Sequence, residues 1–201
     1  MHIYAATASD LEPCVSCWVE AFAEDPITQF LLGVGPDYPA RLTQFFSLLM
    51  QARIALGMPV IVARRDTEIV GGAMGYATEP SVWPENLKEQ WDQFERTTPG
   101  MGERSALYDR IARQSEPGVP HYYLGVIGVH PRLKSRGIGA GLLRSFCDRS
   151  ASDLSSRGVY LETANPGNVA FYERAGFAVT GEGRLGSARL WCMFLSHALS
   201  A

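Results

Sequence analysis

The sequence predicts an α/β fold, in which a mixed sheet of about seven strands is covered by helices on both faces. Short apolar runs rich in aromatic and β-branched residues alternate with longer segments whose apolar residues recur at helical spacing. The central run, Tyr122–Val129 (YYLGVIGV), suits a buried strand, and Pro131 ends it because proline has no N–H for a ladder. Gly137 and Gly139 then open a segment with helical spacing, so we expect a helix directly after the strand.

Length and composition favour one globular domain spanning residues 1–201. Hydrophobic residues make up 46% of the chain and charged residues 19%, and the formal net charge of −3 implies no basic surface for nucleic acid. The start MHIYAATASDLE lacks the basic and apolar regions of a secretory signal, and no apolar run is long enough to cross a membrane. We therefore expect a soluble, cytoplasmic protein without nucleic-acid or membrane partners.

The first part of the chain is expected to form three helices and the first three strands. The expected elements are a strand at residues 2–7, a helix from Ser9 or Asp10 to about Ala23, a short helix at 27–32, an amphipathic helix at 38–56 and a hairpin of strands at 59–64 and 69–77. Gly71, Gly72 and Gly75 indicate a bulge or a close approach in the second hairpin strand. Cys14 and Cys17 lie in a helical pattern without a second pair, which favours buried cysteines over a zinc site or a redox pair.

An insertion is predicted at about residues 79–120, between the hairpin and the central strand. It should contain two helices, at about 84–96 and 103–114, joined by a loop. Long insertions in a compact domain are often lids or binding elements. We expect most of Trp83, Trp91 and Phe94 to anchor the insertion on the core, with one aromatic ring reaching a substrate pocket.

The loop after the central strand has the composition of an anion-binding helix start. Basic residues run through 132–136, and Gly137 and Gly139 let a ligand approach the backbone closely. The first N–H groups of a helix have no internal partner, and the helix dipole there favours anions, so we predict a diphosphate site. The dinucleotide pattern G-x-G-x-x-G fails because Leu142 stands at its third glycine, and a tight packing turn is the alternative.

A second stretch, LETANPGNVAFYERAGF, combines a strand at 159–163, a turn, a helix at 168–175 and the stop Gly176. Together with the loop KSRGIG it resembles the GNAT superfamily, the Gcn5-related N-acetyltransferases, although Lys134 replaces the usual Gln or Arg. LETANPGNVAFYERAGFAVT, RLWCMFL and AFAEDP look like the branch of puromycin N-acetyltransferases, which acetylate small amines. Two last strands are expected at 177–180 and 189–195, with the turn at 181–186.

The resemblance implies the GNAT fold, whose two central strands splay apart to admit the pantetheine arm, and acetyl-CoA as the cofactor. The residues expected to hold the cofactor lie on the central strand, the loop and the helix of the second motif: Ile127, Gly128, Val129, Lys134, Ser135, Arg136, Gly137, Ile138, Gly139, Ala140 and Asn168.

Three residues are the main candidates for proton transfer, and two more are ranked behind them. Tyr172 lies four residues after Asn168, hence on the same helix face, where its O–H is placed to serve the departing sulfur; a packed core tyrosine is the alternative. Glu162 ranks first as general base and His121 second, before Glu79 and Asp25. A bulge in the central strand would free an N–H group for the oxygen that gains charge.

The acceptor is expected to be a small primary amine, bound by Asp25 and Trp83 beneath the N-terminal helices and the insertion. Asp25 has the alternative role of capping the next helix. Two other functions remain open: a peptide N-terminus as acceptor, and an acyl-CoA-binding module without catalysis. We expect no metal ion, and a homodimer is possible.

Overall fold

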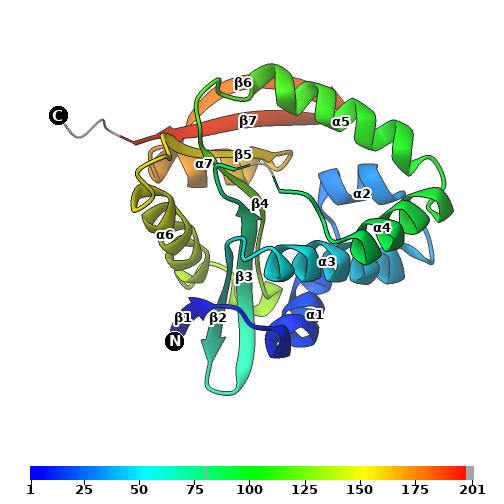
Figure 1. Ribbon diagram of the computed structural model, residues 1–201, viewed down its shortest axis with the longest axis horizontal. Helices are drawn as coiled ribbons and strands as arrows, with labels where there is room; N and C mark the ends of the chain where they lie inside the picture. The colour runs from blue at the N-terminus through cyan, green and yellow to red at the C-terminus, as the bar shows by residue number, and fades with distance from the viewer. Residues whose placement is uncertain (80, 198–201) are drawn as a thin grey trace.

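One seven-stranded sheet forms the centre of the computed structural model, which describes residues 1–79 and 81–197 (Figure 1). The strand order is β1-β2-β3-β4-β5-β7-β6, and each neighbouring pair is antiparallel except β4 with β5. The strands are β1 His2–Ala5, β2 Val60–Arg65, β3 Glu68–Tyr76, β4 Tyr122–Val129, β5 Gly158–Thr163, β6 Ala178–Leu185 and β7 Ala188–Ser196. The mixed sheet predicted from the sequence is therefore confirmed.

Helices cover both faces of this sheet. They are α1 Leu11–Ala21, α2 Pro26–Leu32, α3 Tyr38–Ala55, α4 Glu85–Thr97, α5 Met101–Ser115, α6 Ile138–Ala151 and α7 Pro166–Arg174, with short 3₁₀ helices η1 Ala8–Asp10 and η2 Pro131–Leu133. In Figure 1, α6 lies across the sheet from α1, α3 and α4, and α5 runs along β6. One apolar core lies under α1, α3 and α4, another under α6 and α7, and a third between α5 and the last strands.

The turn expected at residues 181–186 is wrong, because β6 continues through it to Leu185. The glycines of this segment serve helix packing. A Cβ on Gly181 would lie 2.0 Å from the Ser115 hydroxyl oxygen, and one on Gly183 would lie 2.3 Å from Ile111, both on α5. Glycine therefore lets the insertion helix lie directly on the strand, and the real turn follows at Gly186, which has φ of 60°.

The two central strands separate after a short parallel contact. Among the described residues, β4 and β5 pair only at Tyr122 with Val159 and at Tyr123 with Tyr160. Beyond this point the carboxyl ends of the two strands diverge, so the backbone groups of β4 that face β5 have no ladder partner there in the described part of the chain. This gap is the splayed arrangement expected from the sequence.

A β-bulge at Gly125 changes the faces to which β4 directs its side chains. Val126 pairs with Met74 and Leu124 with Gly75, which leaves Gly125 as the extra residue on β4. Leu124 packs in the core under α6, and Val126 packs in the core under α1 and α3. Without the extra residue both side chains would point to the same face.

The glycines of β3 allow close approach of the neighbouring elements, as expected. A Cβ on Gly72 would lie 2.9 Å from both Cys14 and Trp18 of α1, and one on Gly75 would lie 1.8 Å from the carbonyl oxygen of Tyr123. The strand also has a register shift beside β2, between Ala63 and Arg64. The missing side chain at Gly72 therefore lets α1 pack directly on the sheet.

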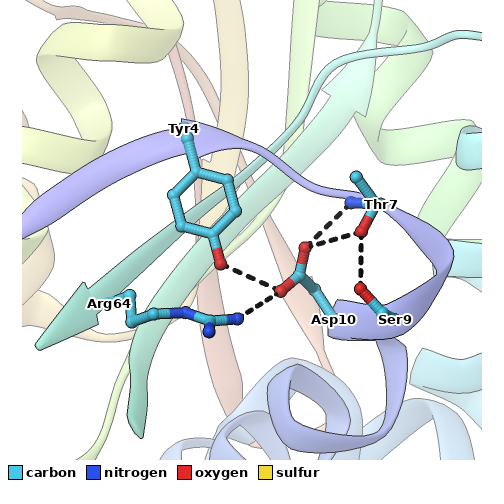
Figure 2. A network of polar contacts seen from close by, with 5 residues as sticks. All are labelled: Tyr4, Thr7, Ser9, Asp10 and Arg64. Atoms are coloured by element: carbon cyan, nitrogen blue, oxygen red, sulfur yellow. Dashed lines mark hydrogen bonds and ion pairs between the residues drawn. The ribbon is translucent and has the colours of Figure 1, made fainter. Parts of the chain in front are cut away.

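A buried carboxylate ties the start of the chain to the hairpin (Figure 2). Asp10, 2% exposed, accepts hydrogen bonds from the Tyr4 hydroxyl at 2.9 Å and the Thr7 N–H at 2.9 Å, and it pairs with Arg64 at 2.7 Å. Burial opposes its ionisation, but the hydrogen bonds outweigh burial and lower the pKa of Asp10. This network is structural, since its residues line neither of the cavities described below.

Candidate active site

Two cavities meet at the gap between β4 and β5. The inner cavity, of about 310 Å³, lies between the sheet and helices α2 to α5, and the loop cleft, of about 870 Å³, lies beside the loop before α6. Both are lined by Phe22, Asp25, Ile127, Asn168 and Tyr172. A ligand in the loop cleft can therefore reach a second ligand in the inner cavity at these residues.

The loop cleft contains an anion-binding helix start. The N–H groups of Ile138, Gly139 and Ala140 open α6 and have no hydrogen-bond partner among the described residues. Ser135 and Gly137 have positive φ of 63° and 79°, which turns the loop around the start of the helix. A Cβ on Gly139 would meet only ordinary contacts, 3.7 Å from Val129, so the glycine leaves the space above it to a ligand.

The predicted cofactor residues gather around this cleft. It is lined by Ile127, Gly128, Val129, Lys134, Ser135, Gly137, Ile138, Gly139, Ala140 and Asn168. Arg136, also predicted, is exposed in the same loop but does not line the cleft. Free N–H groups, a helix dipole and Lys134 together suit a diphosphate group.

Backbone N–H groups of β4 face the gap between the central strands. His130 donates its N–H to Val70 on the β3 side, and successive N–H groups of a strand alternate in direction. The N–H groups of Ile127 and Val129 therefore point away from β3, toward the gap. A bulge in the central strand that frees such N–H groups was expected from the sequence, and a bulge is present at Gly125, just before Ile127 and Val129.

Asn168 and Tyr172 lie together on one face of α7, at the junction of the two cavities. The Asn165 side chain caps this helix by accepting the Gly167 N–H at 2.9 Å, and Asn168 donates weakly to Thr163 at 3.4 Å. Tyr172 is 5% exposed, and its hydroxyl has no hydrogen-bond partner among the described residues. Burial chiefly raises the pKa of Tyr172, with a further contribution from Asp25, so the phenol stays protonated and available as a donor.

Glu162 lies on β5 and lines the inner cavity, where two tyrosines hold it. The Tyr108 hydroxyl, from α5, donates to Oε2 of Glu162 at 2.9 Å and lies 3.1 Å from the Tyr123 hydroxyl of β4. Burial raises the pKa of Glu162 to about 7, although hydrogen bonds from the tyrosines favour the charged form. A carboxylate with this pKa is suited to accept a proton near neutral pH.

The other candidate bases lie elsewhere. His121, directly before β4, contacts the Val119 carbonyl oxygen at 2.7 Å and Glu116 at 3.4 Å, and its ring packs on Tyr160 and Phe194. Neither His121 nor Glu79 lines either cavity. The structure therefore brings Glu162 and Tyr172 to the same cavity and leaves His121 at the other end of the strand.

Of the two residues predicted to bind the acceptor, Asp25 lines the inner cavity and Trp83 does not. Asp25 lines both cavities, but its carboxylate accepts the Thr28 N–H at 2.9 Å and so also caps α2, the alternative role considered for it. Trp83 packs edge-on against Trp91 and donates to the Tyr76 hydroxyl at 3.0 Å, outside the inner cavity. Trp91 lines the cavity instead, so one of the three aromatic residues considered, Trp83, Trp91 and Phe94, does reach it.

Cys14 and Cys17 are buried free thiols, as expected for core residues. Burial raises the pKa of Cys17 to about 11, which keeps this thiol protonated at neutral pH. Among the described residues there is no cluster of His, Cys, Asp and Glu that could hold a metal ion, and no helix long and apolar enough to span a membrane.

The inner-cavity residues that were not predicted from the sequence include Arg53, Tyr108 and Tyr123. Tyr108 and Tyr123 belong to different elements, and no sequence spacing brings them to Glu162. Arg53 did carry a signal, because it follows Leu49 by four residues on the apolar face of its helix. A charge at such a position marks either a pairing partner or a functional site.

The splayed sheet, the anion-binding helix start and the carboxylate beside them define a transferase that takes an acyl-CoA. The model of the acetyltransferase (GNAT) family matches residues 19–177, and the chain belongs to this family. It is an acyltransferase, and its cofactor is acetyl-CoA.

Solved acetyltransferases have the same fold. A histone acetyltransferase HPA2 and related acetyltransferase from Corynebacterium glutamicum matches with a TM-score of 0.76 and 22% identity, over 99% of this chain and 98% of that one. A polyamine N-acetyltransferase from Drosophila melanogaster, described as forming N-acetylagmatine, matches with a TM-score of 0.66 and 18% identity, over 98% and 99%. A putative acetyltransferase from Salmonella typhimurium, solved with acetyl-CoA, matches with a TM-score of 0.59 and 18% identity, over 100% and 98%.

Proposed function

We propose that this acetyltransferase moves an acetyl group to the primary amine of a small molecule bound in the inner cavity. The observation that carries the proposal is a cavity of about 310 Å³ that contains Glu162 and joins the loop cleft at Asn168 and Tyr172. This volume is at the lower end of ordinary small-molecule sites, about 300–1,000 Å³. The resemblance to enzymes that acetylate small amines also supports it.

Glu162 is the proposed general base. An amine is protonated at neutral pH and must lose a proton before it can attack a thioester. A carboxylate whose pKa is about 7 takes that proton more readily than an ordinary glutamate does. The hydrogen bond from Tyr108 holds Oε2 in place, so the other oxygen of the carboxylate is left to meet the amine directly or through water.

The cofactor is proposed to lie in the loop cleft, and acetyl-CoA supplies the acetyl group as a thioester. The N–H groups of Ile138, Gly139 and Ala140, with Lys134, would hold its diphosphate. N–H groups of Ile127 and Val129 are oriented to donate to the oxygen that gains charge. Tyr172 would donate its O–H to the departing sulfur.

The test is thiol release from acetyl-CoA with a panel of small amines and of peptides with free N-termini. We expect turnover with one or more small amines and little or none with the peptides. Glu162→Gln should lose turnover on the same amine while it still binds acetyl-CoA. Efficient acetylation of peptides alone would contradict the small-amine assignment.

A further inference from the structure

Arg53 presents a buried positive charge to the inner cavity. It lies in the last turn of α3, is 3% exposed, and is the one lysine or arginine among the described residues that line this cavity. Its Nη1 donates to the Leu49 carbonyl oxygen at 3.1 Å, and its guanidinium carbon lies 4.3 Å from the ring centre of Tyr76. Its buried Nε has no hydrogen-bond partner in the described part of the chain.

No carboxylate of the described residues pairs with this guanidinium. Among the described residues, the ion pairs within 4.0 Å do not include Arg53, although Asp25, Glu95, Asp109 and Glu162 line the same cavity. A buried charge without a partner is unfavourable, and an apolar side chain of similar volume would fill the position without that cost. Burial accordingly lowers the pKa of Arg53, and the nearby phenol groups of Tyr76 and Tyr123 oppose that shift.

The space in front of the guanidinium is kept open by Gly125, the bulge residue of β4. A Cβ on Gly125 would lie 3.6 Å from Nη2 of Arg53 and 3.0 Å from the Tyr123 ring. Nη2 makes no hydrogen bond to the described residues, so a donor edge of the side chain is unused. A planar guanidinium with free donors is the side chain best matched to a carboxylate.

We propose that the acceptor is an amine that also carries a carboxylate, and that Arg53 binds this carboxylate. The inference rests on the proposed function and names the class of its substrate. The tyrosines connect the two charged groups: Arg53 lies over Tyr76, whose ring stacks 6.4 Å from that of Tyr123, and the Tyr123 hydroxyl reaches Glu162 through Tyr108. The same cavity thus holds Arg53, which suits a carboxylate, and Glu162, which suits an ammonium group.

The experiment measures binding without turnover. The full-length protein, saturated with coenzyme A, is titrated with the standard amino acids and with their carboxamides, and the Kd is read from tryptophan fluorescence, since Trp91 lines the cavity. We expect a carboxylate to bind at least about 10-fold more tightly than its carboxamide, as hydrogen bonds to charged groups usually provide. Arg53→Met should remove this preference.

Arg110→Met is the matched control, because Arg110 is exposed on α5 and lines neither cavity. This variant should keep the preference for the carboxylate. Thermal denaturation checks folding, and Arg53→Lys, which keeps the charge but not the planar fork, replaces Arg53→Met if that variant does not fold.

Two results would overturn the subsite. One is a wild-type protein that binds no carboxylate more tightly than its carboxamide, and the other is a preference that persists in Arg53→Met. Failure of the proposed function looks different. Thiol release with amines that lack a carboxylate, without any carboxylate preference, leaves the function standing and removes the subsite. Carboxylate binding through Arg53 without thiol release leaves the subsite standing and removes the proposed function.

Discussion

At the scale of single residues, the environment of Glu162 decides its chemistry. The side chain is held by a tyrosine from the insertion and lies beside another from the central strand, inside the inner cavity. Burial moves its pKa to about 7, whereas an exposed glutamate titrates near about 4.3. The same carboxylate on the surface would be too weak a base for an ammonium group at neutral pH.

The first prediction concerns the pH dependence of turnover. kcat/KM for the acceptor should rise with pH and level off above about 7, because Glu162 must be ionised to take the proton. Glu162→Gln keeps the shape of the side chain and should lower kcat/KM by about 10²–10⁴-fold. The rise of kcat/KM with pH up to about 7 should be lost in this variant. Glu173→Gln, an exposed carboxylate on α7, is the control. An unchanged profile in Glu162→Gln would exclude Glu162 as the base.

The same pKa shift predicts an effect on stability. The folded protein holds the Glu162 proton more tightly than the unfolded chain does, so this group lowers the free energy of unfolding as pH rises from about 4.5 to about 7. Each pKa unit corresponds to about 1.4 kcal/mol, which makes the total a few kcal/mol at most. Urea denaturation at pH values below and above this window should show a smaller pH dependence in Glu162→Gln than in the wild type.

Tyr172 carries the second prediction for turnover. Tyr172→Phe removes only the hydroxyl, so kcat should fall by about 10²-fold while acetyl-CoA affinity stays near the wild-type value. Tyr122→Phe is a matched control, because Tyr122 is buried on β4 and lines neither cavity. Wild-type turnover in Tyr172→Phe would show that the tyrosine only packs the core.

At the scale of secondary-structure elements, the start of α6 combines three features of an anion site. Its first N–H groups are free, the residues before it have positive φ, and Gly139 leaves the backbone accessible. Each feature alone also occurs in ordinary turns. Together, on a helix of 14 residues that follows the central strand, they place positive partial charge at the wall of the loop cleft.

Gly139→Glu tests this site. The new side chain would occupy the cleft with a negative charge, so acetyl-CoA affinity should fall by at least about 100-fold. This factor corresponds to a loss of roughly 2.7 kcal/mol of binding free energy. Gly118→Glu adds the same side chain in an exposed loop where a Cβ meets nothing within 4 Å, and it should bind normally. Isothermal titration with acetyl-CoA measures both. Equal affinity of a folded Gly139→Glu protein would mean that the cofactor lies elsewhere.

The insertion acts as a wall of the inner cavity. Its helices contribute Trp91 and Glu95 from α4 and Met101, Ser105, Tyr108 and Asp109 from α5. The glycines of β6 bring α5 onto the sheet, which in turn sets Tyr108 at hydrogen-bond distance from Glu162. The segment therefore contributes to the site as well as covering it.

At the scale of the whole molecule, the opening of the sheet depends on how closely β3 and β4 approach. A Cβ on Gly75 would lie 1.8 Å from the Tyr123 carbonyl oxygen and 2.7 Å from Phe146. The obstacle is backbone, which cannot move aside without shifting β4. The bulge at Gly125 and the separation from β5 both lie next to this point.

Gly75→Ala should therefore destabilise the protein by at least about 3 kcal/mol, the upper end of ordinary overpacking. Gly118→Ala, in open space, should leave stability within about 0.5 kcal/mol of the wild type. Chemical denaturation of both variants provides the comparison. A Gly75→Ala protein of wild-type stability would mean that β3 and β4 adjust freely.

Much of the fold follows from the sequence, because it depends on local patterns. Alternation, helical spacing and proline and glycine positions located the sheet strands and helices, and the bounds of β4 agree with the prediction. The exception is β6, where glycines that serve packing against α5 were taken as turn residues. The sequence does not distinguish a glycine that permits a positive φ from one that permits a close approach. The element packed against the glycine must be known to separate the two roles.

The sequence by itself determined the family, the cofactor and the residues that a single strand, loop or helix brings together: the loop before α6 and the pair Asn168 and Tyr172. Only the tertiary structure brought Arg53, Tyr108 and Tyr123 into the cavity of Glu162. It also placed Trp91 rather than Trp83 at this cavity, and it separated His121 from both cavities. The physical reason is that backbone hydrogen bonding and periodicity act between neighbours in sequence. Burial, charge pairing and pKa shifts act between neighbours in space, which only the packed sheet and helices define.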